Sequence, residues 1–250
     1  MWTVSLNGQG VAFGAQYRNQ LTLTIGGQYG YFKDQNFSPL SYRSGGLRFG
    51  IGYGRITKGG HYFITELGVS VSSLTPNLPD PRKPDRFLVD LSVGYLKATV
   101  PQSEKRRIDL GIKYRSYLDL TLYEGSEALS FFALHGLELA GQGYWKRGQR
   151  SHFFTDFSLP VFGLLVRPPY TGWDKFISSN PEAVPRIITR GKWTSLNDFT
   201  AFRARVGWDY QLSTQWAIGA RYGLQYYATQ QLKPVRILNN QFAVMAIRKY

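Results

Sequence analysis

The sequence predicts an all-β protein, a closed antiparallel transmembrane β-barrel of about twelve strands, and three observations support this. Apolar and polar residues alternate with a period of two over segments of about ten to fifteen residues, which suits strands tilted across a bilayer. Aromatic residues make up 16% of the chain and Gly contributes 27 of its 250 residues, a composition typical of β-structure. Short and long connections alternate, as periplasmic turns and external loops do in such barrels.

The alternation is clearest in residues 87–97. Phe87, Val89 and Leu91 fall on one face of an extended chain, and Asp90 and Ser92 fall on the other. The next segment, residues 107–115, sets apolar residues against charged ones in the same way. Further strands are predicted over residues 20–33, 45–57, 60–74, 129–145, 150–166, 199–212, 215–229 and 242–250. Their apolar faces suit lipid.

A soluble β-sandwich or lipocalin-like barrel is the alternative explanation of this pattern. Such a protein turns its aliphatic face inward. Here the small and charged residues form the face that would point inward in nearly every segment, which is typical of membrane barrels. The mean hydropathy of -0.27 and the lack of a run of about 18 apolar residues exclude a transmembrane helix.

The N-terminal segment decides the predicted strand count. About eleven strands follow from residue 10 onward, and a barrel with a periplasmic C-terminus requires an even number. A twelfth strand would be residues 2–6, joined through Asn7-Gly8, a dipeptide favoured in hairpins. The alternative is one bulged strand over residues 2–18. Since Met1-Trp2-Thr3-Val4 lacks the basic and apolar regions of a signal peptide, we expect mature sequence here.

Long external loops are predicted in one barrel domain spanning residues 1–250, at residues 34–44, 75–86, 167–198 and 230–239. The longest loop contains three large aromatic residues, Trp173, Phe176 and Trp193. A solvated loop does not need so much apolar surface. We therefore expect these residues either to fold into the barrel mouth as a lid or to dock a partner.

Alternate residues of a strand lie on opposite faces, and this assignment places a balanced set of charges inside the barrel. The predicted pore-lining residues are Arg48, Glu66, Asp90, Asp109, Lys113, Arg115, Glu138, Asp156, Arg203, Arg205, Asp209 and Arg221. Six bases facing six acids can pair internally, and Arg is the preferred partner of a carboxylate. Two interpretations follow: a constriction whose transverse field orients passing solutes, or a salt-bridged filling of the lumen.

Most of the net charge of +14 would then lie outside the wall, in loop residues such as Lys83, Arg86 and Arg167. External bases of this kind can bind the phosphates of lipopolysaccharide or concentrate anionic solutes. A nucleic-acid partner is not expected, because bases and aromatic residues do not cluster on one polar platform.

No catalytic or metal-binding pattern is found in the sequence. His61, His135 and His152 each stand alone on their predicted strands, without the serine two residues later that lipid-acting barrel enzymes carry. A metal site needs at least three converging ligands, and no such set occurs at local spacing. We therefore predict no enzyme activity, no metal and no cofactor.

The last segment has Phe242, Val244 and Ala246 on one face and ends on Tyr250. It resembles the C-terminal signal by which Gram-negative outer-membrane barrels are recognised for assembly, although Arg248 in the outward row departs from that pattern. The resemblance implies a bacterial outer-membrane location, in contact with lipid and lipopolysaccharide. Tyr17-Arg18-Asn19-Gln20 is also similar to segments of Bacteroidota outer-membrane proteins, including barrels of type IX secretion.

The leading functional hypothesis is a passive channel or transporter for small polar solutes, with anions favoured. The inward bases would line its path and residues 167–198 would gate it. The alternative is a non-conducting accessory barrel that docks other outer-membrane proteins within a secretion, assembly or uptake complex. Full pairing of the inward guanidiniums, without a continuous water path, would exclude the channel.

Overall fold

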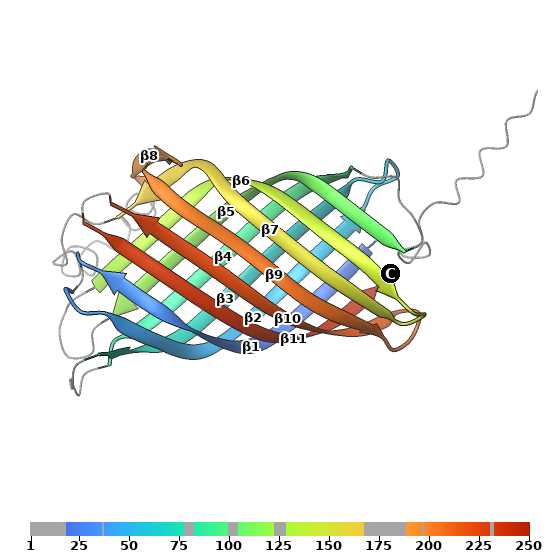
Figure 1. The fold of residues 1–250 in the computed structure, drawn as a ribbon, viewed down its shortest axis with the longest axis horizontal. Coiled ribbons are helices and arrows are strands. Elements are labelled where there is room, and N and C mark those ends of the chain that lie inside the picture. The colour runs from blue at the N-terminus through green and yellow to red at the C-terminus, as the bar shows by residue number, and fades with distance from the viewer. Residues whose placement is uncertain are drawn as a thin grey trace, which may run out of the picture.

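The structure is a computed structural model that describes residues 19–36, 38–77, 83–99, 105–122, 129–167, 189–196, 198–230 and 233–250. The strands are β1 (Asn19–Asp34), β2 (Tyr42–Ile56), β3 (Tyr62–Pro76), β4 (Asp85–Ala98), β5 (Arg106–Leu122), β6 (Leu129–Arg147), β7 (Ser151–Val166), β8 (Lys192–Ser195), β9 (Phe199–Gln211), β10 (Trp216–Thr229) and β11 (Val235–Lys249). Figure 1 shows the strands crossing the molecule at a tilt. No helix among the described residues is long and apolar enough to cross a membrane.

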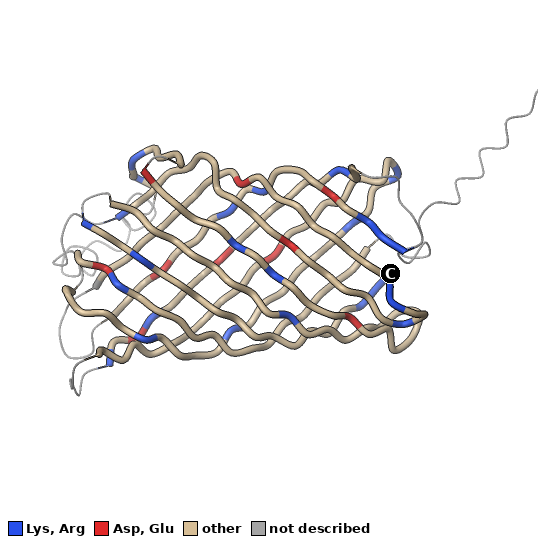
Figure 2. Tube along the Cα trace, in the orientation of Figure 1, with Lys and Arg blue, Asp and Glu red and all other residues tan. Residues whose placement is uncertain are grey.

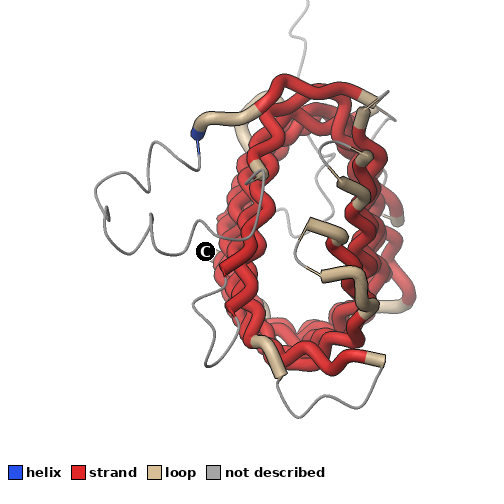
Figure 3. The backbone as a smooth tube through the Cα atoms, turned by 90° about the vertical axis from the view of Figure 1, so that its left-hand side faces the viewer, coloured by secondary structure: helices blue, strands red, loops and turns tan. Residues whose placement is uncertain are grey.

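Ten of these strands close into an antiparallel barrel. Each strand from β1 to β7 pairs with the next, and the ring continues through β9, β10 and β11. β1 closes the ring by pairing with β11, from Gln20 opposite Lys249 to Asp34 opposite Val235. Figure 3 shows this ring end-on as a closed oval.

The barrel therefore has ten strands, and the predicted count of about twelve is not confirmed. That count includes strands before Asn19, and those residues, including 2–6 and 2–18, lie outside the described residues. Ten already satisfies the requirement for an even number. The Asn19 nitrogen donates to the Tyr250 oxygen at 3.0 Å, so both ends of the described wall meet. Because β1 and β11 are direct neighbours, the ring has no place for a strand between them.

The outer face of the barrel is apolar, as the alternation predicts. On β2, Leu47, Phe49 and Ile51 are 58%, 51% and 46% exposed, whereas Arg48 between them is 8% exposed. The same contrast recurs around the ring. An apolar band with a polar interior is the arrangement of a barrel that sits in lipid.

The two ends of the barrel have connections of different length. One end has short turns, such as residues 148–150 and 212–215, and it also holds Asn19 and Tyr250. The other end has the connection between β7 and β9, residues 167–198. We call the first the periplasmic end and the second the extracellular end, following the usual asymmetry.

Three external connections are shorter than predicted because the strands extend into them. They cover residues 35–41, 77–84 and 230–234. Residues 237–239 belong to β11, and Arg86 belongs to β4. Arg86 therefore joins the inward row of a strand and does not lie in a loop.

The lumen is filled differently in its two halves. Towards the extracellular end a cluster of apolar and aromatic side chains fills it, each at most 4% exposed, which we call the apolar plug: Phe32, Tyr42, Leu74, Leu88, Tyr117, Phe132, Leu134, Leu165, Phe199, Ala201, Tyr227, Val235 and Ile237. Towards the periplasmic end the inward residues of β1 and β2 include small and polar ones, such as Thr22, Thr24, Gly50 and Gly52. A second, smaller apolar cluster in this half contains Tyr62, Ile64, Leu96 and Ala140. An eight-stranded barrel is just wide enough for side chains to fill, whereas barrels of about 16 strands hold open channels, so a filled half is expected at ten strands.

β8 lies outside the ring. It pairs with the extracellular part of β7, Phe162 to Leu165, while β9 pairs with the periplasmic part, Ser151 to Ser158. The register between β6 and β7 also shifts at Leu137/Glu138, where Glu138 is opposite Pro160 and Leu137 is opposite Phe162. β7 therefore changes partner where its own register is irregular.

Candidate functional site

All twelve predicted pore-lining residues lie on inward rows, and each forms an ion pair. The pairs are Arg48–Asp90, Arg115–Asp90, Arg203–Asp90, Arg115–Glu138, Arg205–Glu66, Arg205–Asp156, Lys113–Asp156, Arg221–Asp209 and Arg107–Asp109. Figure 2 shows charged residues of both signs along the barrel wall between the two ends. Arg107, the partner of Asp109, is absent from the predicted set.

The first group of ion pairs is centred on Asp90 of β4, which is 3% exposed. Its carboxylate lies 2.9 Å from Arg115 Nη1, 3.3 Å from Arg48 Nη2 and 3.6 Å from Arg203 Nη1. Arg115 Nε also donates to Glu138 Oε1 at 2.8 Å. Three guanidiniums thus share two carboxylates, and these five groups carry one positive charge in excess. We call them the Asp90 cluster.

Arg205 of β9 organises the second group. Its Nη1 donates to Glu66 Oε1 at 2.9 Å and its Nε donates to Asp156 Oδ1 at 3.1 Å. Lys113 Nζ donates to the other oxygen of Asp156 at 2.5 Å. Arg205 Nη2 is buried and has no hydrogen-bond partner among the described residues. The two ion pairs of Arg205 therefore leave one of its donor nitrogens unused.

Two further buried ion pairs were missed by the sequence reading, which places Arg86 and Arg167 outside the wall. Arg86 is fully buried, donates from Nε to Asp119 Oδ1 at 2.8 Å and makes a second contact with Asp119. Arg167 Nη2 donates to Asp34 Oδ1 at 2.7 Å. Burial lowers the pKa of Arg167, and Asp34 opposes this. Arg86 was missed because β4 begins at Asp85, two residues earlier than predicted. Arg167 follows the end of β7 at Val166, as predicted, and only the folded structure shows that its side chain pairs with Asp34.

Two cavities occupy the periplasmic half of the lumen. The inner one has a volume of about 120 Å³ and extends from the Asp90 cluster past Arg205 and Phe154. The outer one, of about 90 Å³, reaches Lys249 and His152 at the strand ends. Tyr62, Tyr144 and Asp209 line both, so the cavities adjoin. We call them together the vestibule.

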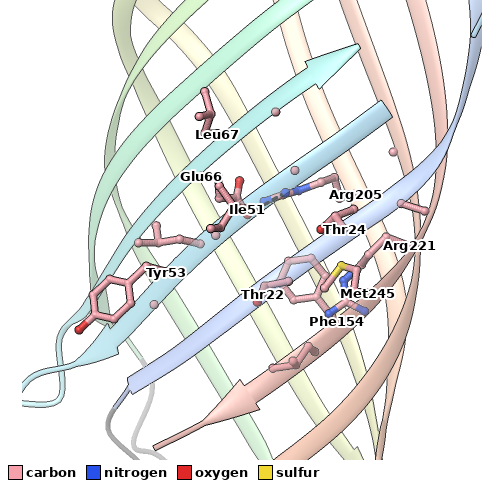
Figure 4. A pocket seen from close by; sticks show the side chains of 18 of the residues that line it. Thr22, Thr24, Ile51, Tyr53, Glu66, Leu67, Phe154, Arg205, Arg221 and Met245 are labelled. Atoms are coloured by element: carbon pink, nitrogen blue, oxygen red, sulfur yellow. Dashed lines mark hydrogen bonds and ion pairs between the residues drawn. The ribbon is translucent and has the colours of Figure 1, made fainter. Parts of the chain in front are cut away.

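Glycines of β2 make room for the inner cavity. Gly52 lines this cavity, and a Cβ there would make ordinary van der Waals contacts at 3.6 Å or more, so a larger side chain would occupy part of the cavity. Figure 4 shows Phe154, Arg205, Arg221 and Met245 around the cavity. Two guanidiniums approach the ring of Phe154, with Arg221 Cζ at 4.4 Å and Arg205 Cζ at 5.8 Å from its centre, distances at which cation–π attraction operates.

The vestibule does not extend into the extracellular half of the lumen. Its lining includes Arg48, Asp90 and Arg203 and none of the side chains of the apolar plug. A solute from the periplasm would therefore reach the Asp90 cluster and meet a packed apolar layer beyond it.

Of the three predicted lid or docking residues, Trp193 lies in the part of the chain that the structure describes. Trp173 and Phe176 lie outside the described residues. Trp193 is on β8, is 63% exposed and stacks on Phe162, with 5.0 Å between ring centres. Phe162 faces outward, so Trp193 lies on the outer surface of the barrel and does not close the lumen. Its role in docking stays a prediction.

The histidines are on the outer surface or near the periplasmic end. His61 stacks on Tyr95, and His135 Nδ1 lies 2.9 Å from Ser116 Oγ on the adjacent strand. This Ser–His contact was missed because the two residues come from different strands, and only strand register brings them together. Each polar group satisfies the other within an apolar surface. Among the described residues no group of three metal-binding side chains occurs.

Comparison with known proteins supports the fold. No family model and no curated protein matches the chain. Among solved structures, the outer membrane protease OmpT from Escherichia coli matches with a TM-score of 0.56 at 5% identity, covering 96% of this chain and 99% of that one. The translocator domain of the autotransporter NalP from Neisseria meningitidis matches with 0.49 at 12% identity, covering 93% and 88%. An outer membrane channel from Pseudomonas putida F1 matches with 0.44 at 9% identity, covering 99% and 100%.

The likeness to the outer membrane protease OmpT extends to the fold alone. Together with the apolar outer band, this shared fold identifies the protein as a transmembrane β-barrel. The similarity to Bacteroidota barrels finds no support among the similar structures.

Proposed function

We propose that the protein is a non-conducting outer-membrane barrel that acts as a subunit of a larger secretion, assembly or uptake complex. The observation that carries this proposal is the apolar plug, which fills the extracellular half of the lumen with side chains at most 4% exposed. The polar groups enclosed with the plug, such as Arg86 and Asp119, bond to one another and so do not replace the hydration of a passing ion. A barrel of this kind acts through what it binds.

The ion pairs support the same conclusion. Asp90 and Asp156 each form ion pairs with two or more bases, and the Arg86–Asp119 pair is fully buried. Buried charges that satisfy one another in this way fill the lumen. The transverse field of a constriction requires instead that opposite charges face each other across water.

Planar-bilayer recording of the purified barrel tests the proposal. We expect no conductance steps from protein that migrates as a folded, heat-modifiable barrel. As a positive control, Phe199→Ala together with Tyr227→Ala removes two plug side chains whose rings are 6.2 Å apart and should produce leak events. Steady steps from the unmodified barrel would overturn the proposal.

A passive channel for small polar solutes, with anions favoured, is the second candidate. It is favoured by the vestibule, which already hollows the periplasmic half and is lined by bases such as Arg205 and Arg221. Conduction would require the apolar plug to move. Anion-selective steps that weaken when Arg203 and Arg205 are changed to Ala would support this function.

Mild extraction tests the accessory role directly. We expect the barrel to leave native membranes together with other outer-membrane proteins, and a Trp193→Ala variant to retain less of them, because Trp193 is 63% exposed outside the ring. A lone monomer after the gentlest extraction would count against a subunit role.

Lipopolysaccharide is the lipid partner we propose for the extracellular rim. Lys33 and Arg236 lie directly opposite each other on outward rows of β1 and β11. Like charges in this position destabilise a sheet unless an anion lies near them. The double variant Lys33→Gln/Arg236→Gln should copurify with less lipopolysaccharide, whereas Arg55→Gln at the periplasmic end should not change the amount.

A further inference from the structure

The vestibule has the features of a binding site that opens to the periplasm. Its inner cavity measures about 120 Å³, close to the roughly 150 Å³ of an engineered protein cavity that accepts benzene. With the adjoining outer cavity of about 90 Å³, the vestibule exceeds that volume and has room for one flat ring. Phe154, Tyr62 and Tyr144 supply aromatic surface in its wall.

The charges around the vestibule favour an anion. Six bases line the two cavities, Arg48, Arg107, Arg203, Arg205, Arg221 and Lys249, against four acids, Glu66, Asp90, Asp109 and Asp209. Within the Asp90 cluster, three guanidiniums share two carboxylates. Buried charge without a counterion is costly, so an anion in the cavity would be stabilised.

Two guanidiniums in the lining of the inner cavity have a hydrogen-bond donor that their ion pairs leave unused. Arg203 is 5% exposed, its ion pair with Asp90 is the longest of that cluster at 3.6 Å, and its Nε is buried without a partner among the described residues. Arg205 Nη2 is in the same situation. Both side chains line the inner cavity, and a guanidinium is well matched to a carboxylate.

We propose that the vestibule binds a small organic carboxylate with a flat apolar group, which enters from the periplasm. The carboxylate accepts hydrogen bonds from Arg203 and Arg205, and the flat group lies near Phe154. This inference rests on the proposed function in one respect, because a sealed extracellular half makes the periplasm the side of entry. A free metabolite and the C-terminus of a periplasmic chain both supply such a carboxylate.

Calorimetric titration of the purified, folded barrel tests the proposal, with benzoate as the probe and neutral benzamide as its uncharged analogue. We expect saturable binding of benzoate and at least tenfold weaker binding of benzamide. A tripeptide ending in phenylalanine, with a free or an amidated C-terminus, distinguishes the two sources of the carboxylate: binding of the free form shows that a chain end also enters.

Two variants on the same strand locate the site. Gly52→Leu fills the inner cavity, since its Cβ meets Glu66 Cγ and Thr22 Cβ at an ordinary 3.7 Å, and should abolish benzoate binding. Gly45→Leu faces outward with nothing within 4 Å and should leave binding unchanged. Arg203→Gln should weaken benzoate binding at least tenfold and affect benzamide little.

Three results would overturn the proposal: no saturable binding, equal binding of benzoate and benzamide, or binding that persists in Gly52→Leu. These outcomes are separable from failure of the proposed function, because conductance is recorded on the same preparation. A silent barrel without benzoate binding refutes the site alone. A conducting barrel that binds benzoate refutes the sealed lumen alone.

Discussion

At the scale of single residues, the stability of this barrel depends on charges buried in pairs. Arg86 shows the most complete enclosure: it contacts Asp119 through two nitrogens, donates to Asn239 Oδ1 at 3.1 Å, and lies 5.1 Å from the ring centre of Phe32. Tyr117 also donates to Asp119 at 2.9 Å. Removing one partner would leave a desolvated charge, which costs far more than the net contribution of the intact pair.

Arg86→Ala should therefore destabilise the barrel by about 3–5 kcal/mol, the usual result of leaving one buried charge unpaired. The free energy of unfolding from urea titration in lipid vesicles measures this. Arg43→Ala, at an exposed base on β2, is the matched control and should change it little. If the double variant Arg86→Met/Asp119→Leu proves as unstable as Arg86→Ala, the unpaired charge is not the cause.

The sequence allows the face on which a charged residue lies to be predicted, but not the partner with which it pairs. The alternation along a strand is enough to assign Arg205 and Asp156 to one face, because one residue along a strand always changes the face. It could not give their partners, since Arg205 and Glu66 are 139 positions apart and meet across the lumen. The vestibule could not be predicted from the sequence either, because its volume depends on the distance between opposite walls of the barrel.

At the scale of strands, the barrel depends on close approach between β1 and β11. Gly26 faces inward on β1, where a Cβ would lie 2.0 Å from the Phe242 oxygen and 2.7 Å from Ala243 Cα. Those are backbone atoms of the closing strand, so they cannot rotate away. Gly27, the next residue, faces outward, and its Cβ would come no closer than 3.9 Å to the Gly46 oxygen.

Gly26→Val should prevent closure of the ring, whereas Gly27→Val should fold normally. The shift of the unheated band in a denaturing gel, which reports a closed barrel, measures the difference. The two variants carry the same side chain at adjacent positions, so propensity and hydrophobicity are matched. Equal folding of both would show that the β1–β11 contact tolerates displacement.

At the scale of the whole molecule, the lumen changes character halfway along the barrel. The sequence contains a signal for this: at the extracellular ends of several strands the alternation gives way to continuous apolar runs, such as Phe131-Phe132 and Leu164-Leu165-Val166. Alternation predicts which side chains face inward. It does not show that apolar inward residues from distant strands meet as one plug, and the strand count of about twelve left a lumen wide enough to stay open.

Cysteine accessibility tests this asymmetry, since the chain has no Cys of its own. Thr24→Cys faces the inner cavity and Ser72→Cys, at 3% exposure, lies in the extracellular half. In vesicles with one barrel orientation, a small impermeant maleimide should label Thr24→Cys from the periplasmic side alone and Ser72→Cys from neither side. Lys58→Cys in a periplasmic turn and Ser195→Cys on β8 report which side the reagent reaches. Labelling of Thr24→Cys from the extracellular side would reveal a continuous path, because the reagent must pass the apolar plug to reach it.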